Sequence, residues 1–191
     1  MPDQMDAIDR SVRRPARTFI VHVEDKPGVL DRVASMFRRR SYNIESLVVG
    51  PTDRAGVSQM TIVCGVDARR AHLVEANLYK LVNVLRVEDI TDEPAVRRDL
   101  ALIKVRADHD KRAEILQITD VFRARVVDVA PEALIVEITG NDQKIQSLVD
   151  VLAPFGILEM ARTGVVAMTR AQRALTEQDI LGEPLTAAES R

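Results

Sequence analysis

The residues best suited to bind a ligand lie in the stretch EDKPGVL at positions 24–30. Gly28 permits a tight turn and lets a ligand approach the backbone closely. The pattern that follows predicts a helix, and the first amides of a helix point outward at its positive end, where an anion can bind. Asp25 adds a nearby carboxylate. An α-amino acid is a zwitterion, so it could place its carboxylate on the amides and its ammonium group on Asp25.

The same stretch also fits a purely structural role. In that interpretation Asp25 or Lys26 begins a capped helix and Pro27 occupies its first turn, so that no ligand is involved. The local sequence leaves both interpretations open.

The sequence contains no recognisable catalytic or metal-binding motif. His22, His72, His109 and Cys64 are candidate metal ligands, but none has a partner at ligand spacing, and neither CxxC nor HxxxH occurs. We interpret these four residues as isolated surface or core side chains. A GxSxG nucleophile motif and a glycine-rich phosphate loop are also missing from the sequence. We therefore expect no catalytic residue and no metal site.

Composition and charge are those of an ordinary globular protein. Of 191 residues, 46% are hydrophobic and 29% are charged, and the formal net charge is −2. Basic clusters occur at residues 13–17 and 38–40, but the sequence has no Trp, two Tyr and four Phe. Because nucleic-acid surfaces usually combine basic residues with aromatic stacking, we expect no nucleic-acid partner.

The sequence favours a cytoplasmic location. No apolar run is long enough to cross a bilayer, so we expect no membrane association. Residues 1–16 lack the apolar stretch of a signal peptide and contain three aspartates, which argues against a transit peptide. The lone Cys64 cannot form an internal disulfide, which fits a reducing compartment.

The first half of the chain alternates between strand and helix patterns. Residues 18–24 alternate apolar and polar side chains, which is the period of a half-buried strand. Residues 29–40 carry the apolar stripe of an amphipathic helix, with Leu30 counted on the buried face. The expected elements are strands at 18–24, 44–49, 57–63 and 84–90, and helices at 29–40 and 68–81.

The same β-α-β-β-α-β order recurs after the polar segment 92–99, which contains a proline and predicts a linker. Each half is therefore a split β-α-β unit, an α+β ferredoxin-like domain with two helices on one face of its sheet. In the second half, helices are expected at 111–122, with Leu116 on the buried face, and at 141–153; strands are expected at 100–107, 125–129, 134–139, 157–163 and 165–168.

The predicted organisation is a disordered lead at 1–16, a first domain at 17–91, the linker at 92–99, a second domain at 100–170 and a mobile tail at 171–191.

Each unit is small for independent stability. A unit of roughly 75 residues buries a marginal core, and its sheet keeps one uncovered face and one open edge strand. We therefore expect a homodimer.

Several sequence blocks resemble one family. The first half contains VEDKPGVLDRVASMFRRRSYNIESLVVGPTD, SQMTIVCG and LYKLVNVLRVEDIT, and the second contains LALIKVRA, VFRARVVDVAPEALIVEITGNDQKI and LAPFGILEMARTGVVAMTR. Together they resemble the small regulatory subunits of acetolactate synthase (acetohydroxyacid synthase), whose first domain is an ACT domain. The resemblance runs from Arg17 to Arg170, and the YNIESL and LALIKV blocks make it specific.

The resemblance implies a partner and an allosteric role in branched-chain amino acid biosynthesis. The partner would be a separate catalytic large subunit that uses thiamine diphosphate, Mg²⁺ and usually FAD to convert two pyruvates into 2-acetolactate and CO₂. This chain would bind no cofactor. It would activate that subunit and confer feedback inhibition by valine, although leucine or isoleucine is also possible as the ligand.

The resemblance also implies a ligand site between two ACT domains. By position, the ligand loop is Asp25, Gly28, Val29 and Leu30, and the facing chain contributes Asn43 and Ile44.

Three positions depart from the family pattern. Asp25 stands where relatives often have Asn, which strengthens the contact with an ammonium group and puts the ligand preference in question. Ser41 replaces the usual Gly at the expected end of the first helix, so we expect it in a left-handed conformation. Gln59 replaces an Arg that many relatives carry, which puts any contact of that Arg with the catalytic subunit in question.

Two other functions are alternatives. A free-standing ACT-domain sensor acting on another enzyme or a transcription factor would explain the first half but not the LALIKV block and the rest of the second. A small enzyme with a ferredoxin-like fold would require a catalytic cluster that the sequence does not offer.

Overall fold

The computed structural model describes residues 16–170. They divide into two compact units, one comprising residues 16–94 with Arg170 and the other Ala95–Thr169. The expectations of a disordered lead and a mobile tail fall on residues 1–15 and 171–191 and lie outside the described residues.

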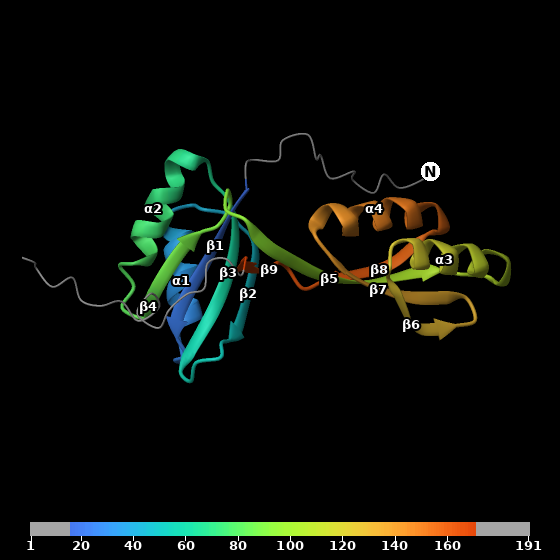
Figure 1. The fold of residues 1–191 in the computed structure, drawn as a ribbon, viewed down its shortest axis with the longest axis horizontal. Coiled ribbons are helices and arrows are strands. Elements are labelled where there is room, and N and C mark those ends of the chain that lie inside the picture. The colour runs from blue at the N-terminus through green and yellow to red at the C-terminus, as the bar shows by residue number, and fades with distance from the viewer. Residues whose placement is uncertain (1–15, 171–191) are drawn as a thin grey trace, which may run out of the picture. The chain divides into compact units, whose positions relative to one another are not determined.

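The first unit is an antiparallel sheet whose one face is covered by two helices (Figure 1). Its elements are β1 (Ala16–Glu24), α1 (Val29–Arg39), β2 (Ile44–Pro51), β3 (Val57–Gly65), α2 (Ala68–Leu78) and β4 (Val84–Asp89). The strands lie in the order β2-β3-β1-β4, which makes β2 and β4 the edge strands.

The core of this unit lies between the sheet and the helices. Phe19, Val21 and Val23 alternate along β1 and are fully buried against Val33 and Phe37 of α1. The period of two in residues 18–24 therefore identified the strand and its core face correctly. The opposite face of β1 is also buried, including His22, so the expectation of a half-buried strand was wrong for this central strand.

Tyr79, which follows α2, protects one edge of the sheet. Its hydroxyl donates to the carbonyl of Val87 (3.2 Å) and accepts from the amide of Val87 (3.0 Å), both on the edge strand β4. These two bonds occupy backbone groups that another strand would need in order to pair with β4 at this point. The predicted helix 68–81 accordingly ends earlier, at Leu78.

The second unit repeats the architecture, with its two long helices on one face of the sheet (Figure 1). Its strand order is β6-β7-β5-β8, and β9 pairs separately with the beginning of β5. Its elements are β5 (Ala95–Arg106), α3 (His109–Val121), β6 (Arg125–Ala130), β7 (Ala133–Gly140), α4 (Asp142–Leu152), a short 3-10 helix (Ala153–Phe155), β8 (Ile157–Arg162) and β9 (Val166–Thr169).

The predicted linker at 92–99 is wrong from Ala95 onward, where β5 begins. The polar composition of this segment suggested a loop, but β9 supplies hydrogen-bond partners for residues 95–98. At the next position the buried Asp99 accepts hydrogen bonds from Arg162 (2.9 Å), the Thr163 hydroxyl (3.0 Å) and the Gly164 amide (3.1 Å). These bonds hold the turn from β8 into β9 against β5.

Two leucines expected in the helical cores are exposed instead. The exposed fraction is 46% for Leu30 and 42% for Leu116. Each follows a buried residue directly, Val29 in α1 and Ile115 in α3. Because adjacent helical positions point about 100° apart, the second residue of each pair falls at the edge of the buried face.

Candidate functional site

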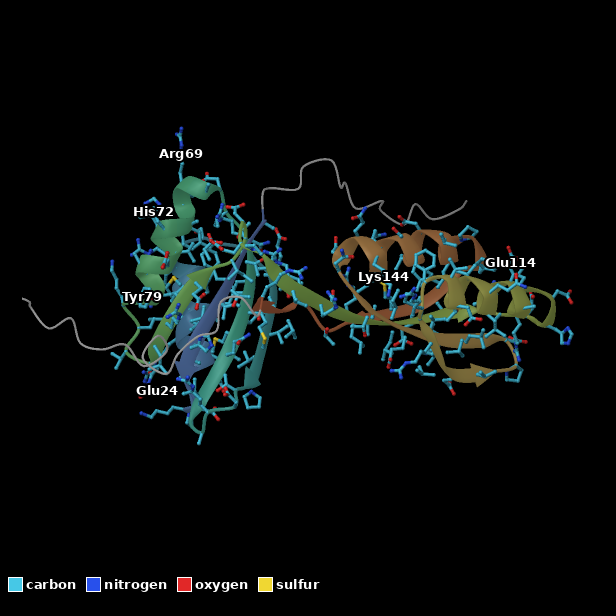
Figure 2. All side chains as sticks on the ribbon, viewed as in Figure 1. Glu24, Arg69, His72, Tyr79, Glu114 and Lys144 are labelled. Atoms are coloured by element: carbon cyan, nitrogen blue, oxygen red, sulfur yellow. The ribbon has the colours of Figure 1, made fainter. Side chains whose placement is uncertain are left out.

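The stretch EDKPGVL forms the connection from β1 to α1, at the end of the first sheet where Glu24 lies (Figure 2). The backbone of this loop is anchored on both sides. The Asp25 amide donates to the Gly56 carbonyl in the β2–β3 turn (2.8 Å), and the Glu24 amide donates to the Asn83 carbonyl before β4 (2.9 Å). The Lys26 amide returns to the Glu24 carbonyl (3.0 Å). The loop is therefore held in one conformation beside the helix start.

Gly28 begins α1 in the left-handed region, with φ 83°. Side chains rarely adopt this conformation, which explains why glycine stands here. A Cβ placed at Gly28 would meet no atom within 4 Å, so the space beside this backbone is open.

The N-terminus of α1 has no side-chain cap. The alternative in which Asp25 or Lys26 caps the helix is therefore wrong. Within the described residues, the amides of Leu30 and Asp31 take part in no hydrogen bond of the chain. Two donors thus remain available at the positive end of the helix dipole, which is the arrangement that binds a carboxylate.

Asn83 is a residue of this site that the sequence analysis missed. It is buried in the loop before β4, and its side chain bridges two parts of the site. Its Oδ1 accepts a hydrogen bond from the guanidinium of Arg32 on α1, and its Nδ2 donates to Glu24 Oε2 (2.5 Å). Lys26 Nζ also reaches Glu24 Oε2 (3.0 Å). The hydrogen bond from Asn83, reinforced by Lys26, lowers the pKa of Glu24.

The predicted ligand residues occupy two distant places in one chain. Asp25 and Gly28 are exposed on the loop, and Val29 is buried beneath it. Asn43, whose carbonyl accepts from the Gly65 amide (3.2 Å), lies with Ile44 at the opposite end of the sheet. The length of β1 separates the two places, about 26 Å at 3.3 Å per residue. One chain alone does not bring these residues together.

Two of the departures from the family pattern are visible in the structure. Ser41 has φ 54°, which confirms the left-handed conformation expected at the end of α1. Its amide donates to Arg38 and the Tyr42 amide to Phe37, which together close the helix in a Schellman motif. Gln59 is half-buried on β3 and lies directly across from His22 of β1.

The candidate metal ligands do not converge. Among residues 16–170, no group of three or more His, Cys, Asp or Glu side chains could hold a metal ion. Cys64 is fully buried, and burial raises the pKa of its thiol to about 12, so it is protonated and unreactive at neutral pH. His22 is buried in β1, whereas His72 and His109 are exposed on α2 and α3. Within the same residues no helix is long and apolar enough to cross a membrane.

Comparison with known proteins places both units in one family. Residues 98–171 match the family described as the small subunit of acetolactate synthase, and residues 19–86 match the AHAS small subunit-like ACT domain. The chain is 46% identical over 161 residues to the acetolactate synthase small subunit of Mycolicibacterium smegmatis, covering 84% of this chain and 95% of the relative. It is 48% identical to that of Mycobacterium bovis, covering 83% and 94%.

A solved structure agrees with the sequence relatives. The crystal structure of the acetolactate synthase small subunit from Thermotoga maritima superimposes with a TM-score of 0.74 at 39% identity, covering 81% of this chain and 97% of that chain. Since relatives of such identity extend over both units, the chain belongs to the family of acetolactate synthase small subunits.

Proposed function

We propose that this chain is a regulatory subunit without a catalytic site of its own. It activates a separate catalytic subunit that forms 2-acetolactate and CO₂ from two pyruvates, and it makes that enzyme sensitive to valine. Thiamine diphosphate, Mg²⁺ and FAD belong to the catalytic subunit. The observation that carries the proposal is the uncapped start of α1 at Gly28, in a chain of the small-subunit family.

The loop offers complementary groups to both charged ends of an amino acid. The ligand carboxylate binds the amides of Leu30 and Asp31, and its ammonium group lies against the exposed carboxylate of Asp25. Sub-millimolar binding requires about 5 kcal/mol. A helix end contributes about 0.3–2 kcal/mol and each charge-assisted hydrogen bond about 1.5–3 kcal/mol. After the cost of ordering the ligand, one loop alone barely suffices, which favours a site completed by a second chain.

The edge strand β2 of the first sheet is where a second chain could pair. Tyr79 occupies backbone groups of β4, whereas β2 at the other edge pairs, among residues 16–170, with β3 alone. A second copy is therefore proposed to pair with β2 and extend the sheet, which buries the exposed edge of both copies.

Antiparallel pairing of two β2 strands explains why residues from both ends of the sheet belong to one site. With the two-fold axis at the middle of β2, Ile44 of the second copy lies opposite Pro51 of the first. Pro51 leads into the turn whose Gly56 carbonyl holds the Asp25 amide. Asn43 and Ile44 of the second copy thus approach the ligand loop, where Ile44 provides an apolar contact for the valine side chain.

The test is acetolactate formation by the catalytic subunit of the same organism, measured alone, with this protein, and with this protein plus valine. Activation followed by inhibition is the expected result. Activation without inhibition would reject the valine site and keep the partner. No effect in either arm would reject the regulatory role and favour a free-standing sensor.

A further inference from the structure

Asn83 is fixed in one orientation by its two partners. Its Oδ1 faces the guanidinium of Arg32, and its Nδ2 faces the carboxylate of Glu24. Rotating the amide by 180° would point the NH₂ group at a cation and the oxygen at an anion, so both contacts would become repulsive. The backbone carbonyl of Asn83 also accepts from the Glu24 amide (2.9 Å). Three contacts therefore connect this single residue to the end of β1 and the first turn of α1.

An irregularity in the sheet places Asn83 at this point. The register between β1 and β4 shifts between His22 and Val23, where His22 pairs with Arg86 and Val23 with Val84. The extra residue is a β-bulge, which redirects the chain locally. It lies directly beside Asn83 and Glu24. The loop before β4 is thus turned toward the ligand loop.

We propose that Asn83 is a positioning residue for amino-acid binding: by bridging Glu24 and Arg32 it fixes the ligand loop relative to the start of α1. The inference rests on the proposed function. Asp25, which faces the ligand ammonium, follows Glu24 directly, and the amides that receive the carboxylate directly precede Arg32. A constraint between Glu24 and Arg32 therefore sets the spacing of the two charge-binding groups, and a preset spacing reduces the ordering cost of binding.

The test uses the full-length chain and valine titrated by calorimetry, followed by the inhibition assay with the catalytic subunit. Asn83→Asp keeps the acceptor for Arg32 but faces Glu24 with a second carboxylate. We expect it to weaken valine binding about tenfold or more. The double variant Asn83→Asp with Glu24→Gln restores a donor–acceptor pair with the direction reversed, and we expect it to recover most of the affinity. Rescue of this kind would not follow from a general loss of stability.

A matched control is available in the same unit. Asn77 is a buried asparagine on α2 whose Nδ2 donates to the Leu73 carbonyl of the same helix (2.6 Å), so its side chain bridges no two segments of the ligand site. Asn77→Asp makes the same chemical change and should lower the thermal midpoint without a comparable loss of valine affinity. An equal loss of affinity in both variants would overturn the positioning role.

Arg32→Gln tests the same role without changing the buried Asn83. Arg32 is exposed, so Arg32→Gln should fold, and it loses the charged contact with Asn83. We expect a several-fold weaker affinity for valine. If the wild-type chain binds valine and Arg32→Gln binds it equally well, the positioning role is wrong while the proposed function stands. If the wild-type chain binds no valine, the valine site and the positioning role are both wrong, and the activation assay alone then tests the regulatory role.

Discussion

The connection from β1 to α1 and the connection from β5 to α3 occupy the same place in two copies of one fold, yet their helix starts differ. Before α1 the loop ends at Gly28, which has no side chain to offer the helix amides. Before α3 the connection is short, and the Asp108 side chain accepts a hydrogen bond from the Lys111 amide (3.0 Å). The second unit thus fills with its own carboxylate the position at which we propose that the first unit binds a ligand carboxylate.

An arginine lies four residues after the N-cap of each helix, and its contacts also differ between the two units. In α3, Arg112 donates to the carbonyls of Ala130 (2.7 Å) and Pro131 (2.8 Å) and so closes the β6–β7 turn over the helix start. In α1, Arg32 donates to the Asn83 side chain instead. The turn between β2 and β3 is held by the hydrogen bond from the Asp25 amide to the Gly56 carbonyl. The same fold thus has a helix start closed by its own side chains in the second unit and an open one in the first, and we expect only the first unit to bind an amino acid.

The largest effect is expected from Gly28→Asp, which gives the first unit the acidic start of the second. The new carboxylate competes for the free amides of α1, and a side chain at φ 83° adds strain. Loss of one or two charge-assisted bonds together with this strain predicts an inhibitory concentration of valine raised about a hundredfold. The inhibition assay measures it, and thermal melting verifies folding. Valine inhibition at the wild-type concentration would contradict the assignment of the site.

The reciprocal change, Asp108→Ala, should affect stability and not regulation. Removing the cap leaves the Lys111 amide unsatisfied, which costs about 1 kcal/mol of unfolding free energy. Denaturant unfolding measures this loss, with Asp67→Ala as the matched control because Asp67 caps α2 in the same way. A shift in the valine response of Asp108→Ala beyond that of Asp67→Ala would contradict the division of roles between the units.

Local sequence patterns were sufficient to predict those parts of the site that are formed by a single segment of the chain. The strand period before Glu24, the helical stripe after Gly28 and the glycine between them predicted the turn and the helix start whose amides point outward. The left-handed Ser41 was predicted from the glycine that the family usually carries at the end of this helix. The contacts that shape both features join residues that are close in the sequence, so a short segment contains the information.

The parts that could not be predicted depend on distant segments. Asn83 and Glu24 are separated by 59 positions, and their contact requires the β-bulge at the start of β4, which no local pattern marks. Similarly, the first residues of β5 read as a linker because their partner strand β9 lies near the end of the described chain. The proposed contribution of a second chain to the site lies beyond the information in any one segment.

A comparison of the two helix ends gives a smaller effect on stability. Ser41 and Arg123 follow α1 and α3 with φ 54° and 51°, and each lies in a Schellman motif. Because a left-handed conformation costs a side-chain-bearing residue about 1 kcal/mol, Ser41→Gly and Arg123→Gly should each raise the thermal midpoint. Calorimetric melting measures both. An unchanged or lower midpoint for Ser41→Gly would reject the strain at that position.

The last expected difference between the units is in their response to pH. His22 lies between core residues on the central strand β1, and the corresponding residue of β5 is Lys104, which is partly exposed and paired with Glu159 (2.5 Å). Burial lowers the pKa of His22, with Arg86 and Arg54 acting in the same direction and Glu88 and Asp53 opposing it. The unfolded chain therefore binds a proton at this histidine more readily than the folded chain, and the free energy of unfolding falls as the pH drops below the unfolded-state pKa of about 6.5.

His22→Gln should reduce the difference between the thermal midpoints measured at pH 7.5 and pH 5.5. Lys104→Gln should leave that difference unchanged, because a lysine remains protonated across this range. An identical pH dependence in His22→Gln and the wild type would show that the folded first unit accommodates a charged His22.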